Sequence, residues 1–259
     1  MTNDLARMTW PEAQELIAKD PIAFVPIGST EPHGPHLCLD TDVTIAEAQT
    51  REACRRLEER GIPTLIAPPV SYGLTNFTDG FAGRVTVRPG TLFNLLEDIC
   101  EGLGQEGISR IVLSNAHLEP AHIEVIRSVV LDFAGPSDER CLDKPHVIFP
   151  DNTRRRWAGT LGDEFKSGEC HAGSYEASIV LAADPEAVRM DELRALPPVE
   201  IGLIAGMRAG KRTFLEMGGD NAYCGDPASA SAEQGHESIG ALADMIVASV
   251  LEAWPELTD

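Results

Sequence analysis

A run of seven residues near the N-terminus, IAFVPIG at positions 22–28, opens the part of the chain that decides the fold. Its unbroken apolar character is typical of a strand that is buried on both faces of a parallel sheet. Pro26 either weakens this prediction or places the strand near an edge of the sheet, because proline cannot donate a ladder hydrogen bond. The strand ends at a glycine, and polar residues follow it directly.

Three further runs have the same buried-strand character, at 64–70, 110–115 and 146–150. Helical patterns separate or follow the strands at 41–60, 89–106, 121–133 and 231–253. Strands that alternate with helices of this length predict βαβ units and a parallel sheet. We therefore expect a single three-layer α/β domain over residues 1–259, with a mostly parallel sheet flanked by helices. The Pro- and Gly-rich stretch at 185–226 is expected to be a loop-rich extension of that domain.

Composition excludes several classes of function. The 21 Lys+Arg residues against 41 Asp+Glu residues give a net charge of −20, which repels nucleic acids and anionic membranes. No apolar run reaches the roughly 18 to 20 residues that a membrane span needs, and the start of the chain has no secretory pattern. Six cysteines without a C-x-x-C pair indicate reduced thiols. We expect a cytoplasmic protein that acts on a small molecule.

The first candidate site residues come directly after the first strand. Glu31 and His33 are two positions apart, so in an extended chain their side chains project to the same side. Asp42 follows at the start of the predicted helix at 41–60. Taken alone, Asp42 is better explained as an acid that interacts with the helix dipole.

A second pair repeats this arrangement. His117 and Glu119 follow the third strand with the same spacing as Glu31 and His33. The carboxyl ends of parallel strands form one edge of the sheet, where ligand sites of α/β proteins lie, so the two pairs converge if their strands are neighbours. Imidazoles combined with carboxylates suit Zn²⁺, Mn²⁺ and similar divalent ions. The spacing therefore predicts a metal site at this edge.

A third cluster lies at 168–176. His171 is flanked by small residues, so a substrate can reach its imidazole. Glu176 begins an apolar helical run, and an ordinary acid at a helix N-terminus is the alternative explanation for it. Arginines at 84 and 154–156 stand out from the acidic background. They offer partners for an anionic substrate group or a neighbouring subunit, although a solvated surface run is the more ordinary interpretation.

Four segments, in this order along the chain, resemble the signature of the creatininase family. They are PIGSTEPHGPHLCLDTD at 26–42, NAHLE at 115–119, HAGSYE at 171–176 and GDPASASAEQG at 225–235. The resemblance implies a creatininase-like fold and a binuclear site with two divalent ions, zinc or manganese or both, with iron as a further option. It also implies a homo-oligomer, which in this family is a hexamer. No strand is followed by G-x-G-x-x-G, so a dinucleotide-binding fold is not expected.

The resemblance also implies roles for individual residues. Glu31, Asp42 and His117 would hold one metal, and His33, Asp42 and Glu119 would hold the other, so that Asp42 bridges the two. His171 matches the catalytic histidine of the family. Two cations would activate a shared water for attack on an amide carbonyl, and Glu119 or His171 would act as general acid/base. Glu176 is an additional candidate site residue, and His36 is expected to shape the loop.

Departures from the family pattern lie around the substrate. Leu118 stands where creatininase has an aromatic residue, and Ser167 stands where it has a tryptophan. We therefore expect hydrolysis of a non-peptide C–N bond in a small amide, cyclic amides included, with an altered substrate pocket. The alternatives are a deformylase or short-peptide hydrolase on the same scaffold, or a metal-binding member of the family that lacks catalysis. Neither the substrate, the native metals nor the general base is specified by the sequence.

Overall fold

The apolar run at 22–28 forms β1 (Ile22–Ile27), an inner strand of a four-stranded parallel sheet. The computed structural model describes residues 2–134 and 144–258. Within them the strand order is β2-β1-β3-β4, and every pairing is parallel, as predicted. The other strands are β2 (Thr64–Ile66), β3 (Arg110–Asn115) and β4 (His146–Ile148). Both β2 and β4 are shorter than predicted, because prolines follow them and remove backbone donors.

Pro26 lies in a strand that is paired on both sides, and not near a sheet edge. The Pro26 carbonyl accepts a hydrogen bond from Val70 N, 2.9 Å away, so its backbone faces residues 67–70. At this level β2 has already ended at Ile66. The missing N–H of Pro26 therefore removes no bond from the β1–β2 ladder, and proline is tolerated at an inner position.

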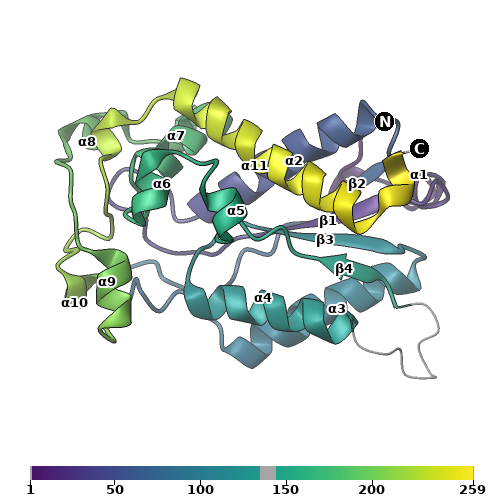
Figure 1. Ribbon diagram of the computed structural model, residues 1–259, viewed down its shortest axis with the longest axis horizontal. Coiled ribbons are helices and arrows are strands. Elements are labelled where there is room, and N and C mark those ends of the chain that lie inside the picture. Colours follow the sequence, from purple (N-terminus) through teal and green to yellow (C-terminus); the bar gives the residue numbers. More distant parts are fainter. Residues whose placement is uncertain (1, 135–143, 259) are drawn as a thin grey trace.

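Helices cover both faces of the sheet, which confirms the three-layer prediction (Figure 1). One face carries α2 (Thr41–Glu58), α7 (Ser174–Ala183) and α11 (Ala232–Ala253). The opposite face carries α3 (Pro89–Gln105) and α4 (Pro120–Phe133). The first α2 residue, Thr41, and the α3 start agree with the helical patterns in the sequence.

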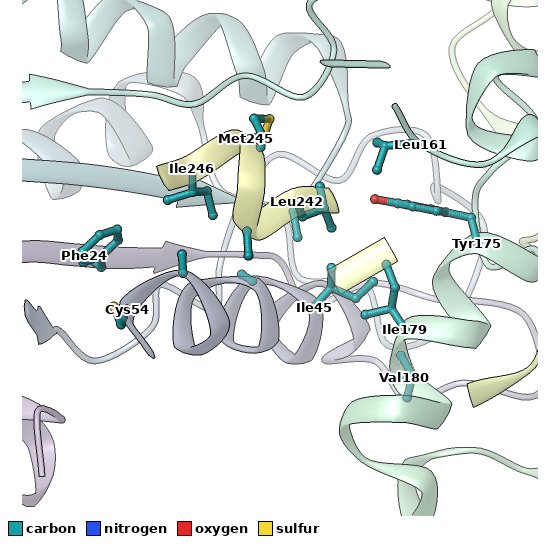
Figure 2. Packing of buried hydrophobic residues seen from close by; sticks show 14 of the residues in the cluster. Phe24, Ile45, Cys54, Leu161, Tyr175, Ile179, Val180, Leu242, Met245 and Ile246 are labelled. Carbon is teal, nitrogen blue, oxygen red and sulfur yellow. The ribbon is translucent and has the colours of Figure 1, made fainter. Parts of the chain in front are cut away.

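Alternation along β1 divides the core between the two layers. Ile22 and Phe24 belong to the cluster with α2, α7 and α11, whereas Ala23, Val25 and Ile27 belong to the cluster with α3 and α4. Figure 2 shows the first cluster, in which side chains of α11 lie between β1, α2 and α7. Because every residue of β1 is buried, the strand is apolar throughout, without polar alternation.

The stretch at 185–226, predicted to be loop-rich, contains three short helices. These are α8 (Met190–Ala195), α9 (Leu203–Arg208) and α10 (Phe214–Met217). The pair α9 and α10 lies at the end of the molecule opposite both chain termini (Figure 1). The remaining helices are α1 (Trp10–Ile17), α5 (Arg155–Ala158), α6 (Asp163–Ser167) and the 3₁₀ turns Leu5–Arg7, Pro185–Ala187, Pro227–Ser229 and Pro255–Thr258.

Two expectations from composition can be compared with the described residues. Among them, no helix has the length and apolar character needed to cross a membrane. The five cysteines of the described segments are free thiols, in line with the expectation of reduced cysteines. Cys141 lies outside the described residues.

Candidate metal centre

The loops that follow β1 and β3 meet the first turns of α2 and α7 at one edge of the sheet. The loop after β1 carries Glu31 and His33, the loop after β3 carries His117, and the helix starts carry Asp42 and Glu176. All five side chains are buried. The strands β1 and β3 are direct neighbours, which is the condition under which the two spaced pairs converge.

One group of ligand-type atoms consists of Glu31, Asp42 and His117. His117 Nδ1 lies 3.1 Å from Glu31 Oε1 and 3.0 Å from Asp42 Oδ2. The other ring nitrogen, Nε2, donates to the Leu74 carbonyl at 2.6 Å. That bond fixes the ring orientation, so that Nδ1 points toward the carboxylates. Metal-binding histidines are commonly oriented in this way by a hydrogen bond from the ring nitrogen that does not bind the metal.

A second group consists of His33, Asp42 and Glu176. His33 Nε2 lies 3.3 Å from Asp42 Oδ1 and 3.6 Å from Glu176 Oε2. His33 Nδ1 donates to the Glu31 carbonyl at 3.0 Å, while Nε2 is buried without a hydrogen-bond partner. The two groups share Asp42, whose Oδ1 faces one histidine and whose Oδ2 faces the other. Such sharing is what a carboxylate that bridges two cations requires.

Glu119 lies beside these groups and belongs to neither of them among the described residues. Its carboxylate accepts hydrogen bonds from Asn76 N and Asn76 Nδ2, both at 2.6 Å, and from Phe77 N at 3.3 Å. It lines the same cavity as Glu31, Asp42 and His117. Among the described residues, the second group contains Glu176, whereas the resemblance implied Glu119 as a ligand to the second metal.

His171 lies at the rim of the cluster. One of its ring nitrogens is within 4.8 Å of ligand atoms of Glu31 and His33. Its Nε2 donates to the Pro32 carbonyl at 3.0 Å, so in the neutral ring Nδ1 is the proton acceptor. His36 is fully buried and away from both groups, with the backbone of Gly34 packed against its ring.

The electrostatics of the cluster are those of a cation site. Burial opposes the charge of His33 and His117, yet the carboxylates of Asp42 and Glu31 outweigh burial and raise the pKa of both rings, that of His33 to about 10. Burial likewise opposes ionisation of Asp42, but the two histidines hold its pKa well below the usual range. The buried carboxylates thus draw positive charge into the site, which two divalent cations would supply.

Three other groups have pKa values shifted toward their neutral forms. Burial raises the pKa of Glu119, and it raises the pKa of Glu176 to about 8. Burial, followed by repulsion from His33, lowers the pKa of His171 to about 4. With this pKa, His171 is neutral near pH 7 and does not repel a cation bound nearby.

A cavity of about 490 Å³, partly open to solvent, leads to the cluster. Its lining combines the site acids and histidines with apolar side chains. The apolar lining residues include Phe77, Leu118, Leu203, Met207 and Phe214. Leu118 is therefore a pocket residue, as expected from the resemblance. Ser167 does not line the cavity, and its hydroxyl donates to the Glu164 carbonyl.

The first turn of α7, which carries Glu176, is held by the carboxylate of Glu164. Its Oε1 accepts from Ser174 N at 3.0 Å and from Asp226 N at 2.7 Å, and its Oε2 accepts from Tyr175 N at 2.7 Å. Glycine is required beside this carboxylate, since a Cβ at Gly173 would lie 2.5 Å from Oε2. Glu164 thus satisfies free N–H groups at the start of the helix and fixes the position of Glu176.

Several residues that support the cluster were not predicted from the sequence. Ser29 donates to Asp42 Oδ2, and Thr78 donates to Glu31 Oε2 at 3.1 Å. Asn76 holds Glu119 from a loop that is far from it in sequence. Single polar residues in loops give no periodic signal, so only the folded chain reveals them.

Arg84, Arg154 and Arg156 are paired with acids, and the arginines at 84 and 154–156 do not line the cavity. Arg84 lies 2.7 Å from Asp79, and its guanidinium also donates to the Thr75 carbonyl. Arg154 and Arg156 contact Asp151 and Glu252. The surface interpretation of these arginines therefore agrees with the structure.

Comparison with known proteins adds sequence relatives to this geometry. Residues 6–250 match a family model named Creatininase and described as creatinine amidohydrolase. The chain is 32% identical over 248 residues to a mycofactocin precursor peptide peptidase from Mycolicibacterium smegmatis, covering 90% of this chain and 87% of the relative. It is 29% identical over 215 residues to a creatinine amidohydrolase from Pseudomonas putida, covering 75% and 76% of the two chains.

Solved structures agree with the observed fold. A structure described as "Creatininase Mn" superposes with a TM-score of 0.72 at 22% identity and covers 98% of this chain and 100% of that chain. A mutant creatininase of the Zn-Zn type superposes with a TM-score of 0.71 at 22% identity, covering 98% and 99%. Both neighbours have the same α/β architecture as this chain.

Proposed function

The chain belongs to the creatininase family of metal-dependent amidohydrolases, and from this we propose that it hydrolyses the C–N bond of a small amide at a binuclear metal centre. The observation that carries the proposal is the pair of acid–imidazole groups that share Asp42. The proposed ligands are Glu31, Asp42 and His117 for one cation, and His33, Asp42 and Glu176 for the other. Zinc and manganese are the proposed ions, because imidazole and carboxylate donors suit both.

The residues fit such ions on structural grounds. His33 Nε2 is buried without a hydrogen-bond partner and faces two carboxylates, which leaves a donor atom available for a cation. His117 is oriented from outside by the Leu74 carbonyl. When bound, two divalent cations would lower the pKa of a shared water and polarise the amide carbonyl.

The remaining polar groups of the cavity are proposed to move protons. Glu119 lines the cavity outside both ligand groups, and burial raises its pKa toward the range useful for a general acid/base. His171, with Nε2 committed to the Pro32 carbonyl, offers Nδ1 as a proton acceptor. We assign proton transfer from the water to Glu119, which then delivers that proton to the leaving nitrogen, either directly or through Nδ1 of His171.

A second candidate is hydrolysis of a short peptide. This reading is favoured by the peptide peptidase from Mycolicibacterium smegmatis, which is similar to this chain over 90% of its length. The creatinine amidohydrolase relative supports the small-amide candidate instead. Leu118, in place of the aromatic residue expected there, makes creatinine itself an unfavoured substrate.

One panel separates these candidates. Metal-loaded protein is incubated with lactams, linear amides, formamides and short peptides, and the products are followed by mass spectrometry. Cleavage of lactams or simple amides supports the leading proposal, and cleavage restricted to peptides supports the second. If a sample with two bound metals by elemental analysis cleaves none of them, the chain is a non-catalytic member of the family.

We also propose that the protein is a homo-oligomer, with a hexamer as the form implied by the family. Exposed apolar side chains at Tyr72 and Leu95 line a groove beside α3 and give a surface on which a subunit can pack. Sedimentation equilibrium of the purified protein tests this. A monomer at micromolar concentration would contradict it.

A further inference from the structure

We infer that α9 and α10 form a specificity wall that selects an uncharged, apolar side group next to the scissile amide. The specificity wall is defined as Leu203, Met207 and Phe214, the residues of α9 and α10 that line the cavity. The inference rests on the proposed function and names the class of substrate: neutral amides with an aliphatic or aromatic group, whether free or at a peptide end. Acidic and basic side groups are excluded.

The specificity wall is built as a fixed part of the site. The carboxylate of Glu169 accepts hydrogen bonds from Ile201 N at 2.9 Å and Leu203 N at 2.7 Å, and so holds the start of α9. At the other end, Phe214 N donates to the Phe77 carbonyl at 2.8 Å. The two helices also pack closely, since a Cβ at Gly206 would lie 2.4 Å from the sulfur of Met217. A wall tied at both ends presents one shape to a substrate.

The specificity wall contacts the candidate catalytic histidine. The ring of Phe214 stacks on His171, with centroids 4.4 Å apart and an interplanar angle of 22°. Phe77 meets Phe214 edge-on at a centroid distance of 6.1 Å. The ring of His171 also lies 4.5 Å from the ring of His33. His171 therefore contacts both the specificity wall and a proposed metal ligand. A substrate side group that binds against the wall is consequently the one next to the reacting bond.

The charged residues that line the cavity are all acids. The described lining residues include no lysine or arginine, and the acids among them are Glu31, Asp42, Glu119 and Glu176, all of which face the metal groups or their loop. Arg84, the nearest arginine in sequence to Phe77, is paired with Asp79 and the Thr75 carbonyl. A charged side group would lose hydration at the specificity wall without gaining a partner there.

The test uses ligands whose binding does not depend on turnover. Hydroxamic acids chelate divalent metals, and their tails would lie where the substrate side group lies. Three probes of matched length are titrated calorimetrically into the zinc-loaded protein: hexanohydroxamic acid, its analogue with a terminal carboxylate, and its analogue with a terminal ammonium. We expect the apolar probe to bind about tenfold or more tightly than either charged probe.

Two variants locate the effect. Met207→Lys places a positive charge in the wall, and is expected to weaken the apolar probe and strengthen the carboxylate probe, each by about tenfold. Ala205→Lys adds the same charge to the same helix at an exposed position that does not line the cavity, and is expected to leave all three affinities unchanged. Circular dichroism of both variants checks that they are folded.

The outcomes separate the two levels of the proposal. Equal affinity for the three probes, or equal responses of the two variants, overturns the specificity wall while the metal centre stands. Acetohydroxamic acid, whose tail is a single methyl group, tests the metal centre alone. If it does not bind, and the protein retains no zinc after dialysis, the metal centre is overturned and the inference with it.

Discussion

His33 Nε2 faces Glu176 Oε2 across 3.6 Å, although the two residues are 143 positions apart in the sequence. Both side chains are buried, and His33 Nε2 has no hydrogen-bond partner. The carboxylate of Glu176 is held by the backbone N–H of Ala172 at 2.6 Å. A buried acid and a buried imidazole in this relation are suited to share a cation. We therefore expect Glu176 to act as a metal ligand and Glu119 to act in proton transfer.

Glu176→Gln is expected to weaken the binding of the second metal. The amide keeps the size of the side chain but loses the negative charge that faces His33, and a ligand of this kind is worth at least the 10- to 100-fold in affinity that outer partners contribute. Elemental analysis after dialysis should give about one metal per chain instead of two. Retention of both metals at wild-type affinity would remove Glu176 from the ligand set.

Glu119→Gln is expected to keep both metals and lose turnover. Its carboxylate lies outside the two ligand groups and is bonded to Asn76 and Phe77, so its loss removes a proton acceptor and not a ligand. General acid/base catalysis contributes about 10²- to 10⁴-fold, and kcat should fall by that range. A variant that loses one metal as well would show that Glu119 is a ligand, as the resemblance alone implied.

Removal of the metals is expected to destabilise the fold. A ligand that binds only the native state stabilises it by about 4 kcal/mol at 1,000 times its dissociation constant. Urea unfolding with zinc at that excess, compared with unfolding in a chelator, should show a difference of this size. His117→Ala removes a proposed ligand and should make the unfolding free energy less dependent on zinc. A fold equally stable in both conditions would argue against the centre.

Glu164→Gln is expected to lower the affinity of the second metal without touching a ligand. Its carboxylate accepts hydrogen bonds from three backbone N–H groups. The glutamine side chain has an NH₂ group in place of one carboxylate oxygen, and this donor would face at least one of the backbone donors without an acceptor. Displacement of the α7 start should weaken metal binding at Glu176 by about 10- to 100-fold. Asp163→Asn, on the exposed neighbouring residue, is the matched control and should bind both metals normally. Equal affinities in the two variants would assign Glu164 a purely structural role.

The sequence predicted the strands and helices because their signal is local. An apolar run such as 22–28 identifies a strand whatever its neighbours are, and the spaced pairs at 31/33 and 117/119 could be assigned to one edge once a parallel sheet was assumed. Pro26 was misjudged for a non-local reason: its tolerance depends on where β2 ends, which only the pairing with residues 67–70 reveals.

The parts of the site that could not be predicted come from long-range packing. Glu176 looks like an ordinary acid at a helix start until α7 is placed against His33. Glu164, Asn76 and Phe214 lie in short helices and loops, where no periodicity indicates which way a side chain points. The roles of Glu119 and Glu176 were consequently open in the sequence, and the contacts of each carboxylate now separate them into two testable positions.

Gly28→Ala is expected to disturb the centre through the backbone. A Cβ at this position would lie 2.5 Å from Val43 N and 2.7 Å from the Asp42 carbonyl carbon. Both contacts are main-chain atoms, so no side-chain rotation relieves them, and the first turn of α2 must move away from β1. Overpacking of this kind costs about 1–3 kcal/mol, and displacement of the shared Asp42 should lower the affinity of both metals together.

Gly102→Ala is the matched control for this prediction. Gly102 lies inside α3, where an added Cβ meets no atom within 4 Å. Alanine there should stabilise the protein by about 0.5–1 kcal/mol, because glycine loses more conformational freedom in a helix, with no change in metal content. Urea unfolding and elemental analysis of the two variants measure both effects. If Gly28→Ala behaved like Gly102→Ala, the close approach of α2 to β1 would not be what positions Asp42 between the two histidines.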